Sequence, residues 1–485
     1  MSRFIPEKPH NEERRIVIKG LGAVGLSLIG ATLFGGCESL IEKIKNRPVR
    51  RRLRTGSAAV DNDIAIYRQA VSLMKALPAS DPRSWSAQAA IHGTAGVGFN
   101  FCQHNTPHFF SWHRAYLFYF EQICRELTGE ANFALPYWNW NQNSAVHPAF
   151  LDSTSSLFDG SRINTSVAGV SNFFSSTLNP IFEDANFFTF STQIEGTPHN
   201  RAHTHIGGTL GGFGSARDPL FWMHHCMVDY CWAKWNLELE NDNTNDSGWN
   251  STEWNHFVDG KGNPATISAA ATTLMPLLSY RYECSPVGKF GCPLDLESLS
   301  AAEFKKLEAR VKAGASVRFD IKKRISISRS QRLLVNRPSE VKADVSAADF
   351  ATIVDADTHA DRVFLSLDYA ALPVRNDFFV RVFINLPEAD ERTSIESEHY
   401  AGSFSFFGTE TGNPPHHHQH QPGFLINVTD TLRQLRRLGK LRSGEPISVQ
   451  LVAIPEGREP LRADTTLQLR ELAFIVSPVT IKRRD

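Results

Sequence analysis

The chain has 485 residues, enough for two domains with separate hydrophobic cores. Its 51 Lys and Arg residues balance its 51 Asp and Glu residues, so the formal net charge is zero. Because this balance leaves no basic surplus, we expect neither nucleic acid nor an anionic membrane surface as a partner.

Residues 1–37 have the pattern of a targeting segment. Arg14 and Arg15 precede a moderately apolar, glycine-rich run that also contains Lys19. This composition favours a twin-arginine export signal, a route for folded proteins, over an uncleaved anchor helix. Cys37 closes "LFGGC", a loose match to a lipoprotein cleavage box, so a lipid anchor at Cys37 is an alternative. We expect an exported protein, periplasmic or secreted, with no stable membrane span after processing.

From Asp61 to about Trp235 the pattern is mostly helical. Apolar residues recur at helical spacing in "DIAIYRQAVSLMKAL" and in "WHRAYLFYFEQICREL". Asp218 followed by Pro219 predicts the start of a further helix, because Asp caps free amides and Pro fits the first turn. Residues 141–190 are rich in Asn, Ser, Thr and Gly and are expected to form irregular loop.

The C-terminal third has a different period. Residues 296–312 predict one charged helix, and the basic, polar stretch after it is expected to be a linker. Beyond the linker, alternating apolar residues are interrupted by one short helix, "DTLRQLRRL". The alternation predicts strands at 362–369, 377–386, 446–455 and 467–476. We therefore expect a β-sandwich in an α+β protein.

Histidines are concentrated in "FCQHNTPHFFSWHR" and "EGTPHNRAHTH". A buried imidazole needs a partner on each nitrogen or a metal ion on one of them. His199 and His203 are four residues apart, so on a helix they share one face. The chain thus offers two sets of three: His92, His104 and His113, then His199, His203 and His225. Imidazole suits copper, zinc, iron and nickel, and two trios on facing helices favour a binuclear centre over a single three-His zinc site.

These stretches resemble the two copper-binding signatures of the tyrosinases and polyphenol oxidases, the type-3 copper family. "HNTPHFFSWHRAYLFYFE" and "PHNRAHTH", the latter followed by "ARDPLFWMHHCMVD", match in spacing, aromatic context and order. "YRQAVSLMKALPASDPRSW" resembles the start of a plant-type catalytic domain, "SYRYE" the tyrosine motif that ends it, and "YAGSFSFFG" the β domain that follows.

The resemblance implies a mainly helical catalytic domain, in which a four-helix bundle holds two copper ions, followed by a β-sandwich that shields it. The expected boundaries are a signal at 1–37, the catalytic domain at 48–290, a linker at 291–330 and the sandwich at 331–480. The resemblance also implies the copper ligands: His92, His104 and His113 for one ion, and His199, His203 and His225 for the other.

Four further residues acquire roles from the resemblance. Cys102, two residues before His104, matches the fungal cysteine that forms a thioether to this ligand; a free buried thiol is the alternative. Glu195 and Asn200 match residues that hold a water accepting the proton of a phenol, although Glu195 also fits a surface carboxylate before a helix. Phe213 is one position away from the Phe that covers the copper pocket in plant enzymes, so a packed loop Phe is an equal alternative.

Other polar residues near the histidines are expected to be supporting. Asp229 and Glu121 either orient ligands or take part in helix capping and ion pairing. Arg217 and Asp218 are expected to brace their loop. Two nearby histidines are not expected to be ligands: His108 and His205.

Two features outside this region leave alternatives open. Cys284 and Cys292 are close enough in sequence to pair across a loop. The run "NPPHHHQH" (413–420) has the composition of a metal site, but two prolines favour a solvated loop over copper recruitment.

The expected partners are O2 and a phenolic small molecule. The expected reaction is oxidation of o-diphenols to o-quinones, and Asn200 favours monophenol hydroxylation as a second activity. A catechol oxidase without monophenol activity is the main alternative. A haemocyanin-like oxygen carrier is less expected, because carriers are usually repeats of this unit. A basic linker would be open to proteases, so the full-length form is expected to be latent.

Overall fold

The computed structural model describes residues 46–478 apart from 96, 169–179, 284–300, 315–320, 355–360, 372, 374–377, 407–422, 456–460 and 462–464. The expected signal with Cys37, the Cys284–Cys292 pair and the histidine run at 413–420 lie outside the described residues. Among the described helices, none combines the length and the apolar character needed to cross a lipid bilayer.

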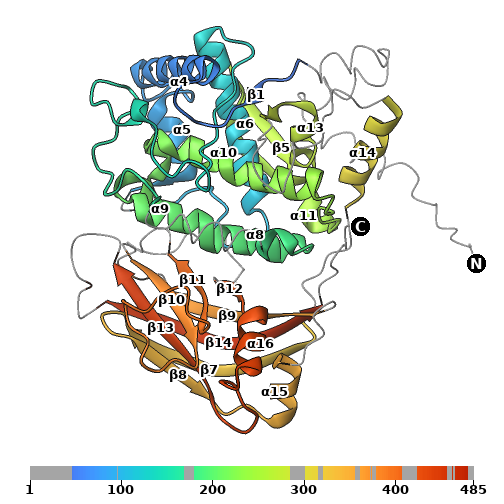
Figure 1. Cartoon of the computed structure of the whole chain (residues 1–485). Helices are drawn as coiled ribbons and strands as arrows, with labels where there is room; N and C mark the ends of the chain where they lie inside the picture. The colour runs from blue at the N-terminus through green and yellow to red at the C-terminus, as the bar shows by residue number, and fades with distance from the viewer. Residues whose placement is uncertain are drawn as a thin grey trace, which may run out of the picture.

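The first half of the chain folds into a mainly helical domain (Figure 1). Helices α6 (Phe109–Thr128) and α10 (Leu220–Ala233) run through its centre, and every residue of α10 is buried. As predicted, Asp218 caps α10, accepting a hydrogen bond from the Leu220 amide at 2.8 Å. Helix α6 ends at Gly129, whose φ of 77° is left-handed. Around this pair lie α4 (Ala58–Ala76), α5 (Trp85–His92), α8 (Phe187–Ile194), the π-helical turn η3 (Glu195–His199) and α9 (Asn200–Ile206).

Short elements complete the helical domain. They are β1 (Val49–Arg50), β2 (Gly93–Thr94), β3 (Gly98–Phe99), η1 (Pro148–Phe150), η4 (Gly208–Gly211), η5 (Ser215–Arg217), η6 (Lys234–Glu238), α11 (Ser247–Ser251), β4 (Glu253–Val258), β5 (Pro264–Ser268), α12 (Ala269–Thr272), α13 (Met275–Leu278) and β6 (Arg281–Tyr282). Helix α14 (Ala301–Ala313) follows, close to the charged helix predicted at 296–312.

The C-terminal domain is the expected sandwich of two antiparallel sheets, and its inner faces share one hydrophobic core. In spatial order, one sheet contains β11 (Tyr400–Ser405), β10 (Phe378–Ile384), β13 (Ile447–Pro455) and β8 (Ser339–Ala343). The other contains β12 (Gly423–Asn427), β9 (Asp361–Ala371), β14 (Thr466–Pro478) and β7 (Lys323–Leu334). Two helices flank the sheets: α15 (Ala347–Val354) and α16 (Thr429–Arg437). All four predicted strands and the predicted short helix are confirmed.

One boundary prediction is wrong. The expected linker at 291–330 includes the first residues of β7, which pairs with β14. Ile325 and Ile327 alternate with Arg and Ser in this strand, so its polar outer face gave it the composition of a linker.

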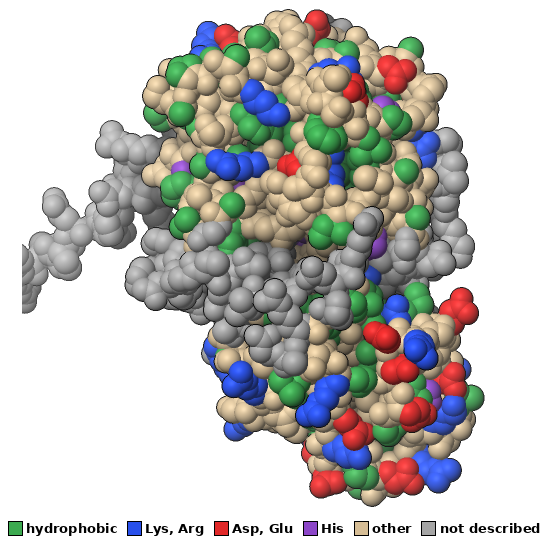
Figure 2. Space-filling model, turned by 90° about the vertical axis from the view of Figure 1, so that its left-hand side faces the viewer, with side chains coloured by type: hydrophobic (Ala, Val, Ile, Leu, Met, Phe, Trp, Pro, Cys, Tyr) green, Lys and Arg blue, Asp and Glu red, His purple; other side chains and the backbone are tan. Residues whose placement is uncertain are grey.

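Helices α8 and α9 lie along one end of the sandwich, with η3 and α9 against β11 and with α8 against β12 (Figure 1). Figure 2 shows that charged side chains of both signs gather on the sandwich on the face drawn, with fewer on the helical domain above it. Because η3 and α9 pack against β11, the metal-site candidates near α9 lie close to the junction of the two domains.

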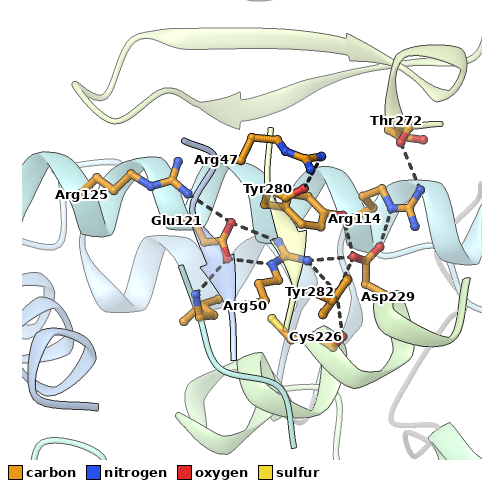
Figure 3. A network of polar contacts seen from close by, with 11 residues as sticks. Arg47, Arg50, Arg114, Glu121, Arg125, Cys226, Asp229, Thr272, Tyr280 and Tyr282 are labelled. Carbon is orange, nitrogen blue, oxygen red and sulfur yellow. Dashed lines mark hydrogen bonds and ion pairs between the residues drawn. The ribbon is translucent and has the colours of Figure 1, made fainter. Parts of the chain in front are cut away.

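A buried arginine joins the start of the helical domain to its two central helices (Figure 3). Arg50 on β1 donates to both carboxylate oxygens of Glu121 on α6, at 2.9 and 3.1 Å, and to Asp229 on α10 at 2.8 Å. Its guanidinium also lies 3.7 Å from the ring centroid of Tyr280. Glu121 and Asp229 are thus ion-pairing residues that hold α6 and α10 together.

Asp229 is the most heavily bonded carboxylate of this network. It accepts hydrogen bonds from the hydroxyls of Tyr280 and Tyr282, each at 2.6 Å, and pairs with Arg114. Burial alone raises the pKa of Asp229, but the two arginines and the two hydroxyls bring the pKa below its ordinary value. Asp229 is therefore ionised and compensated, as a buried charge must be.

Replacing Arg50 should destabilise the fold, because Arg50→Met leaves two buried carboxylates without their cation. We expect the free energy of unfolding to fall by about 3–5 kcal/mol in urea denaturation. Arg54 pairs with Glu283 where both side chains are partly exposed, at 31% and 28%. The control Arg54→Met should therefore change stability by about 1 kcal/mol or less. Equal losses in the two variants would contradict this role for Arg50.

Candidate metal centre

The first histidine trio forms where α5 ends and α6 begins. His92 is the last residue of α5, His104 lies in the following loop, and His113 is in the first turns of α6. All three are buried, with ring centroids 5.2–6.0 Å apart. The Nε2 atoms of His92 and His104 are 3.4 Å apart.

The second trio comes from the segment η3–α9 and from α10. His199 ends η3, His203 lies one turn later on α9, and His225 faces them from α10. Their centroids are 4.6–5.5 Å apart, and the Nε2 atoms of His203 and His225 are separated by 3.3 Å. The predicted trio is therefore assembled in space.

The two trios are direct neighbours. The rings of His113 and His225 stack at 4.3 Å, and those of His104 and His199 are 5.3 Å apart. Histidines of the first trio therefore contact histidines of the second trio, as two metal ions bridged by a small ligand would require.

Hydrogen bonds of Nδ1, on the side of each ring away from the cluster, determine which nitrogen carries the proton and which keeps a lone pair for a metal ion. The Nδ1 atoms of three histidines lie 2.7–3.0 Å from backbone carbonyls, which can only accept: His92 with Phe213, His113 with Phe109, and His203 with Leu210. Nδ1 must therefore carry the proton in these rings, and Nε2 keeps its lone pair. Nε2 of His92 and of His203, which keep their lone pairs, lie 3.4 and 3.3 Å from Nε2 of His104 and of His225, and a cation can bind such a set of nitrogens.

The histidines are also neutral. Burial lowers the pKa of His92 to about 4 and that of His199 to about 3, and it lowers the pKa values of the other four well below their ordinary value. At neutral pH all six rings can therefore act as metal ligands.

Glu195 bonds a histidine of the opposite trio. Its Oε1 lies 3.1 Å from His104 Nδ1 and accepts a hydrogen bond from the Asn105 amide at 2.6 Å. Burial raises the pKa of Glu195 to about 8, against the effect of the Asn105 amide. Asn105 has a φ of 55°, so this loop takes the uncommon left-handed conformation to reach the carboxylate. Glu195 is thus a buried residue of the site, and the alternative of a surface carboxylate is wrong.

Asn200 bonds the neighbouring ligand and the other domain. Its Oδ1 lies 2.8 Å from His199 Nδ1, and its Nδ2 donates to the carbonyl of Ser405 on β11 at 3.0 Å. The two predicted water-holding residues therefore have different partners here, and their joint action on one water stays a prediction.

Phe213 acts through its backbone as well as its ring. Its carbonyl accepts from His92, while its ring, 6% exposed, packs edge-on against Phe99 at 4.7 Å. Phe99 in turn stacks on His104 at 4.6 Å. Phe99 was not predicted, because a single aromatic after a glycine carries no signal in one sequence. The aromatic ring that stacks on His104 is thus that of Phe99 and not that of Phe213.

His224 is a further histidine of the second cluster, next to His225, which the resemblance implies as the ligand of the two. One of its ring nitrogens lies within 4.8 Å of ligand nitrogens of His199, His203 and His225. The indole N–H of Trp140 donates to His224 Nδ1 at 3.1 Å, so the proton of the neutral ring is on Nε2. In that form Nε2 has no lone pair for a metal ion, which favours His225 as the ligand.

Cys102 belongs to the first cluster. Its Sγ lies 3.3 Å from His113 Nε2, and burial raises the pKa of the thiol well above its ordinary value. The described cysteines form no disulfide with one another: Cys102, Cys124, Cys226 and Cys231. The thioether from Cys102 to His104 stays a prediction.

The remaining candidates have structural roles. His205 Nε2 contacts the carbonyl of Ser166, and His108 stacks on Trp249 at 5.6 Å. Asp218 braces its loop through Arg162 as well as Leu220. The expectation for Arg217 is not met, because its side chain is exposed and makes no hydrogen bond within the described part of the chain.

Comparisons with known proteins match both domains. The common central domain of tyrosinase matches residues 82–171 and 159–238. A domain of unknown function matches residues 320–468, which cover most of the sandwich. A tyrosinase of Hahella sp. (strain CCB-MM4) is 26% identical over 78% of this chain and 90% of its own. A chloroplastic polyphenol oxidase of Malus domestica is 26% identical over 80% of this chain and 73% of its own.

Solved structures share the two-domain fold. A latent aurone synthase, a polyphenol oxidase, superposes with a TM-score of 0.62 at 19% identity over 90% of both chains. A functional unit of octopus haemocyanin superposes with a TM-score of 0.53 at 17% identity, over 89% of this chain and all of that one. The chain thus contains a segment that matches the common central domain of tyrosinase, and its sequence is similar to tyrosinases and polyphenol oxidases over most of its length.

Proposed function

We propose that this chain oxidises o-diphenols to o-quinones with O2 and also hydroxylates monophenols. Its family is one of copper oxidases, and its cofactor is a pair of copper ions. The proposed ligands are His92, His104 and His113 for one ion and His199, His203 and His225 for the other. The observation that supports this best is the pair of adjacent trios of buried, neutral imidazoles.

The protein's own contribution is a dry site of low ligand charge. When bound, the copper pair would supply the redox chemistry with O2. Within the described residues neither cluster includes a carboxylate, so an anionic phenolate meets no negative ligand. Phe109 and Phe221, both fully buried, pack against ligands of the two trios and exclude water.

We propose Glu195 as the group that takes the proton of a monophenol, through a water that Asn200 helps to orient. Glu195 Oε1 is already bonded to His104 and Asn105, which leaves Oε2 for a proton or a water. The carboxylate lies beside His104 and within the segment that carries His199, so it lies close to both proposed ions.

The variant Glu195→Gln should separate the two reactions. It keeps an oxygen acceptor for His104 but cannot take a proton, so we expect monophenol hydroxylation to fall by about 10²–10⁴-fold. Oxidation of the matching diphenol, which needs no such base in this scheme, should fall much less. Asp184 is another buried carboxylate, bonded to Thr189 and Gln193, and Asp184→Asn should leave the ratio unchanged. Equal loss of both reactions, together with loss of copper, would mean that Glu195 only holds His104.

The function is tested with copper-loaded protein, a monophenol and its matching diphenol, before and after trypsin treatment. Arg318 lies between α14 and β7 in the sequence, so cleavage there would cut the covalent link between the domains and allow a fraction of the sandwich to dissociate. We expect turnover of both substrates after cleavage and slower turnover before it, because β11 packs against the segment that carries His199 and His203. Oxidation of the diphenol alone would indicate a catechol oxidase, and reversible O2 binding without turnover a carrier. Equal rates before and after cleavage would contradict a shielding role.

We also propose the thioether between Cys102 and His104. Its formation would break one S–H and one ring C–H bond, join sulfur to carbon, and pass two electrons and two protons to O2. Peptide mass spectrometry of copper-loaded, O2-exposed protein should show the peptide containing Cys102 lighter by two hydrogen atoms. The variant Cys102→Ser should show no deficit, and a full-mass wild-type peptide with a reactive thiol would contradict the bond.

Export through the twin-arginine-type segment at 1–37 remains part of the proposal, supported by the pattern around Arg14 and Arg15.

A further inference from the structure

The segment that carries His199 and His203 lies between the metal centre and the sandwich. Its two histidines face the first domain's interior, while three other side chains donate hydrogen bonds to backbone carbonyls at the end of β11. These bonds are Thr197 Oγ1 to Ser403 at 3.3 Å, Asn200 Nδ2 to Ser405 at 3.0 Å and Thr204 Oγ1 to Phe406 at 3.1 Å. The single proton of the Thr204 hydroxyl is shared with the Asn200 carbonyl, which lies at 2.8 Å. The donors are spaced three and four residues apart, so they occupy one face of the helical segment.

Packing strengthens this contact. The guanidinium carbon of Arg201 lies 2.9 Å from the ring centroid of Phe379 on β10, and both residues are buried. A Cβ at Gly196 would lie 3.1 Å from the ring of Phe424 on β12, so only glycine allows this approach without displacing the ring. Both sheets therefore contact the segment.

The segment has little helical stability of its own. Its first part, η3, is π-helical and contains Pro198, which has no amide N–H to donate. Helix α9 continues from η3 without a break, because His199 and Asn200 both have helical backbone angles. A helix that contains a π-helical turn and an internal proline is weakened at that point, so external packing contributes to where the two histidines lie.

Asn200 links the sandwich directly to a proposed ligand. The Ser405 carbonyl can only accept, so the NH2 group of Asn200 must face it and Oδ1 must face His199. Oδ1 can also only accept, so Nδ1 of His199 carries the proton and Nε2 keeps the lone pair. A backbone carbonyl of the sandwich thereby reinforces, through Asn200, the tautomer that the Glu195 carbonyl, 3.3 Å from His199 Nδ1, also requires.

We propose that the sandwich is a positioning element of the metal centre, so that its docking and metal retention by the second trio are coupled. This assigns a role to the domain of unknown function matched at 320–468, in addition to any shielding. The coupling is reciprocal in binding free energy: docking strengthens metal binding, and a bound metal ion strengthens docking by the same amount. The inference rests on the proposed copper ligands but not on the oxidation of phenols.

The test is copper release from the full-length, copper-loaded protein into a Cu(I) chelator under reducing conditions. Thr197→Val and Phe379→Leu remove docking contacts without altering a ligand or Asn200. We expect release of one of the two copper ions to accelerate about tenfold, equivalent to about 1.4 kcal/mol, with the other ion unaffected. The matched control Phe350→Leu changes an equally buried phenylalanine of the sandwich core and should leave release unchanged.

A second measurement uses the wild-type chain, so the test does not depend on the folding of a variant. After trypsin cleavage at Arg318, the two fragments should co-elute in size exclusion more fully with copper than without it. Unchanged release in both docking variants, equal acceleration in Phe350→Leu, or copper-independent co-elution would overturn the coupling. Docking-dependent release from a protein that leaves phenols unoxidised would refute the proposed function and leave the coupling standing.

Discussion

The proposed metal centre depends on one constraint: a neutral imidazole has a single N–H proton, and a ring that offers Nε2 to a metal ion carries this proton on Nδ1, where an acceptor behind the ring favours it. The acceptors are distant in sequence. His92 uses the carbonyl of Phe213, and His203 uses that of Leu210. The fold of the helical domain can be understood as the packing that brings these acceptors behind buried rings. Without these acceptors neither tautomer of these rings would be favoured. The ring nitrogens that face the metal centre would then not all have a lone pair for a metal ion.

The loop between α9 and α10 shows how closely this constraint shapes the chain. Its carbonyls at Leu210 and Phe213 hold one histidine of each trio, and Asp218 with Arg162 fixes its end. A Cβ at Gly93 would lie 2.6 Å from the Phe213 carbonyl oxygen. Any side chain after His92 would therefore displace the acceptor that sets the tautomer of His92. The glycine is required by the ligand's hydrogen bond and not by an unusual backbone angle.

The six histidines could be predicted because His199 and His203 have helical spacing and because both histidine-rich stretches resemble known copper-binding signatures, although His104 lies in a loop. Four strands were predicted because their apolar residues alternate. Strand β7 was missed because Arg and Ser on its outer face masked the alternation of Ile325 and Ile327. The partners of Asn200 could not be predicted, because Ser405 lies on another domain and contributes only a backbone carbonyl, which any residue provides. A contact made by a backbone group does not depend on the residue type, so neither composition nor spacing can predict it.

The edge strand β11 connects the fold of the sandwich with the proposed metal centre. An edge strand has carbonyls without strand partners, which invite pairing with another chain unless something covers them. Here the side chains of Thr197 and Asn200 cover them, and the same segment carries two proposed metal ligands. On the proposed coupling the sandwich is more than a shield. Its removal would also release the Asn200 amide that faces His199 Nδ1, so the expected gain in access would come with a less firmly held metal ion.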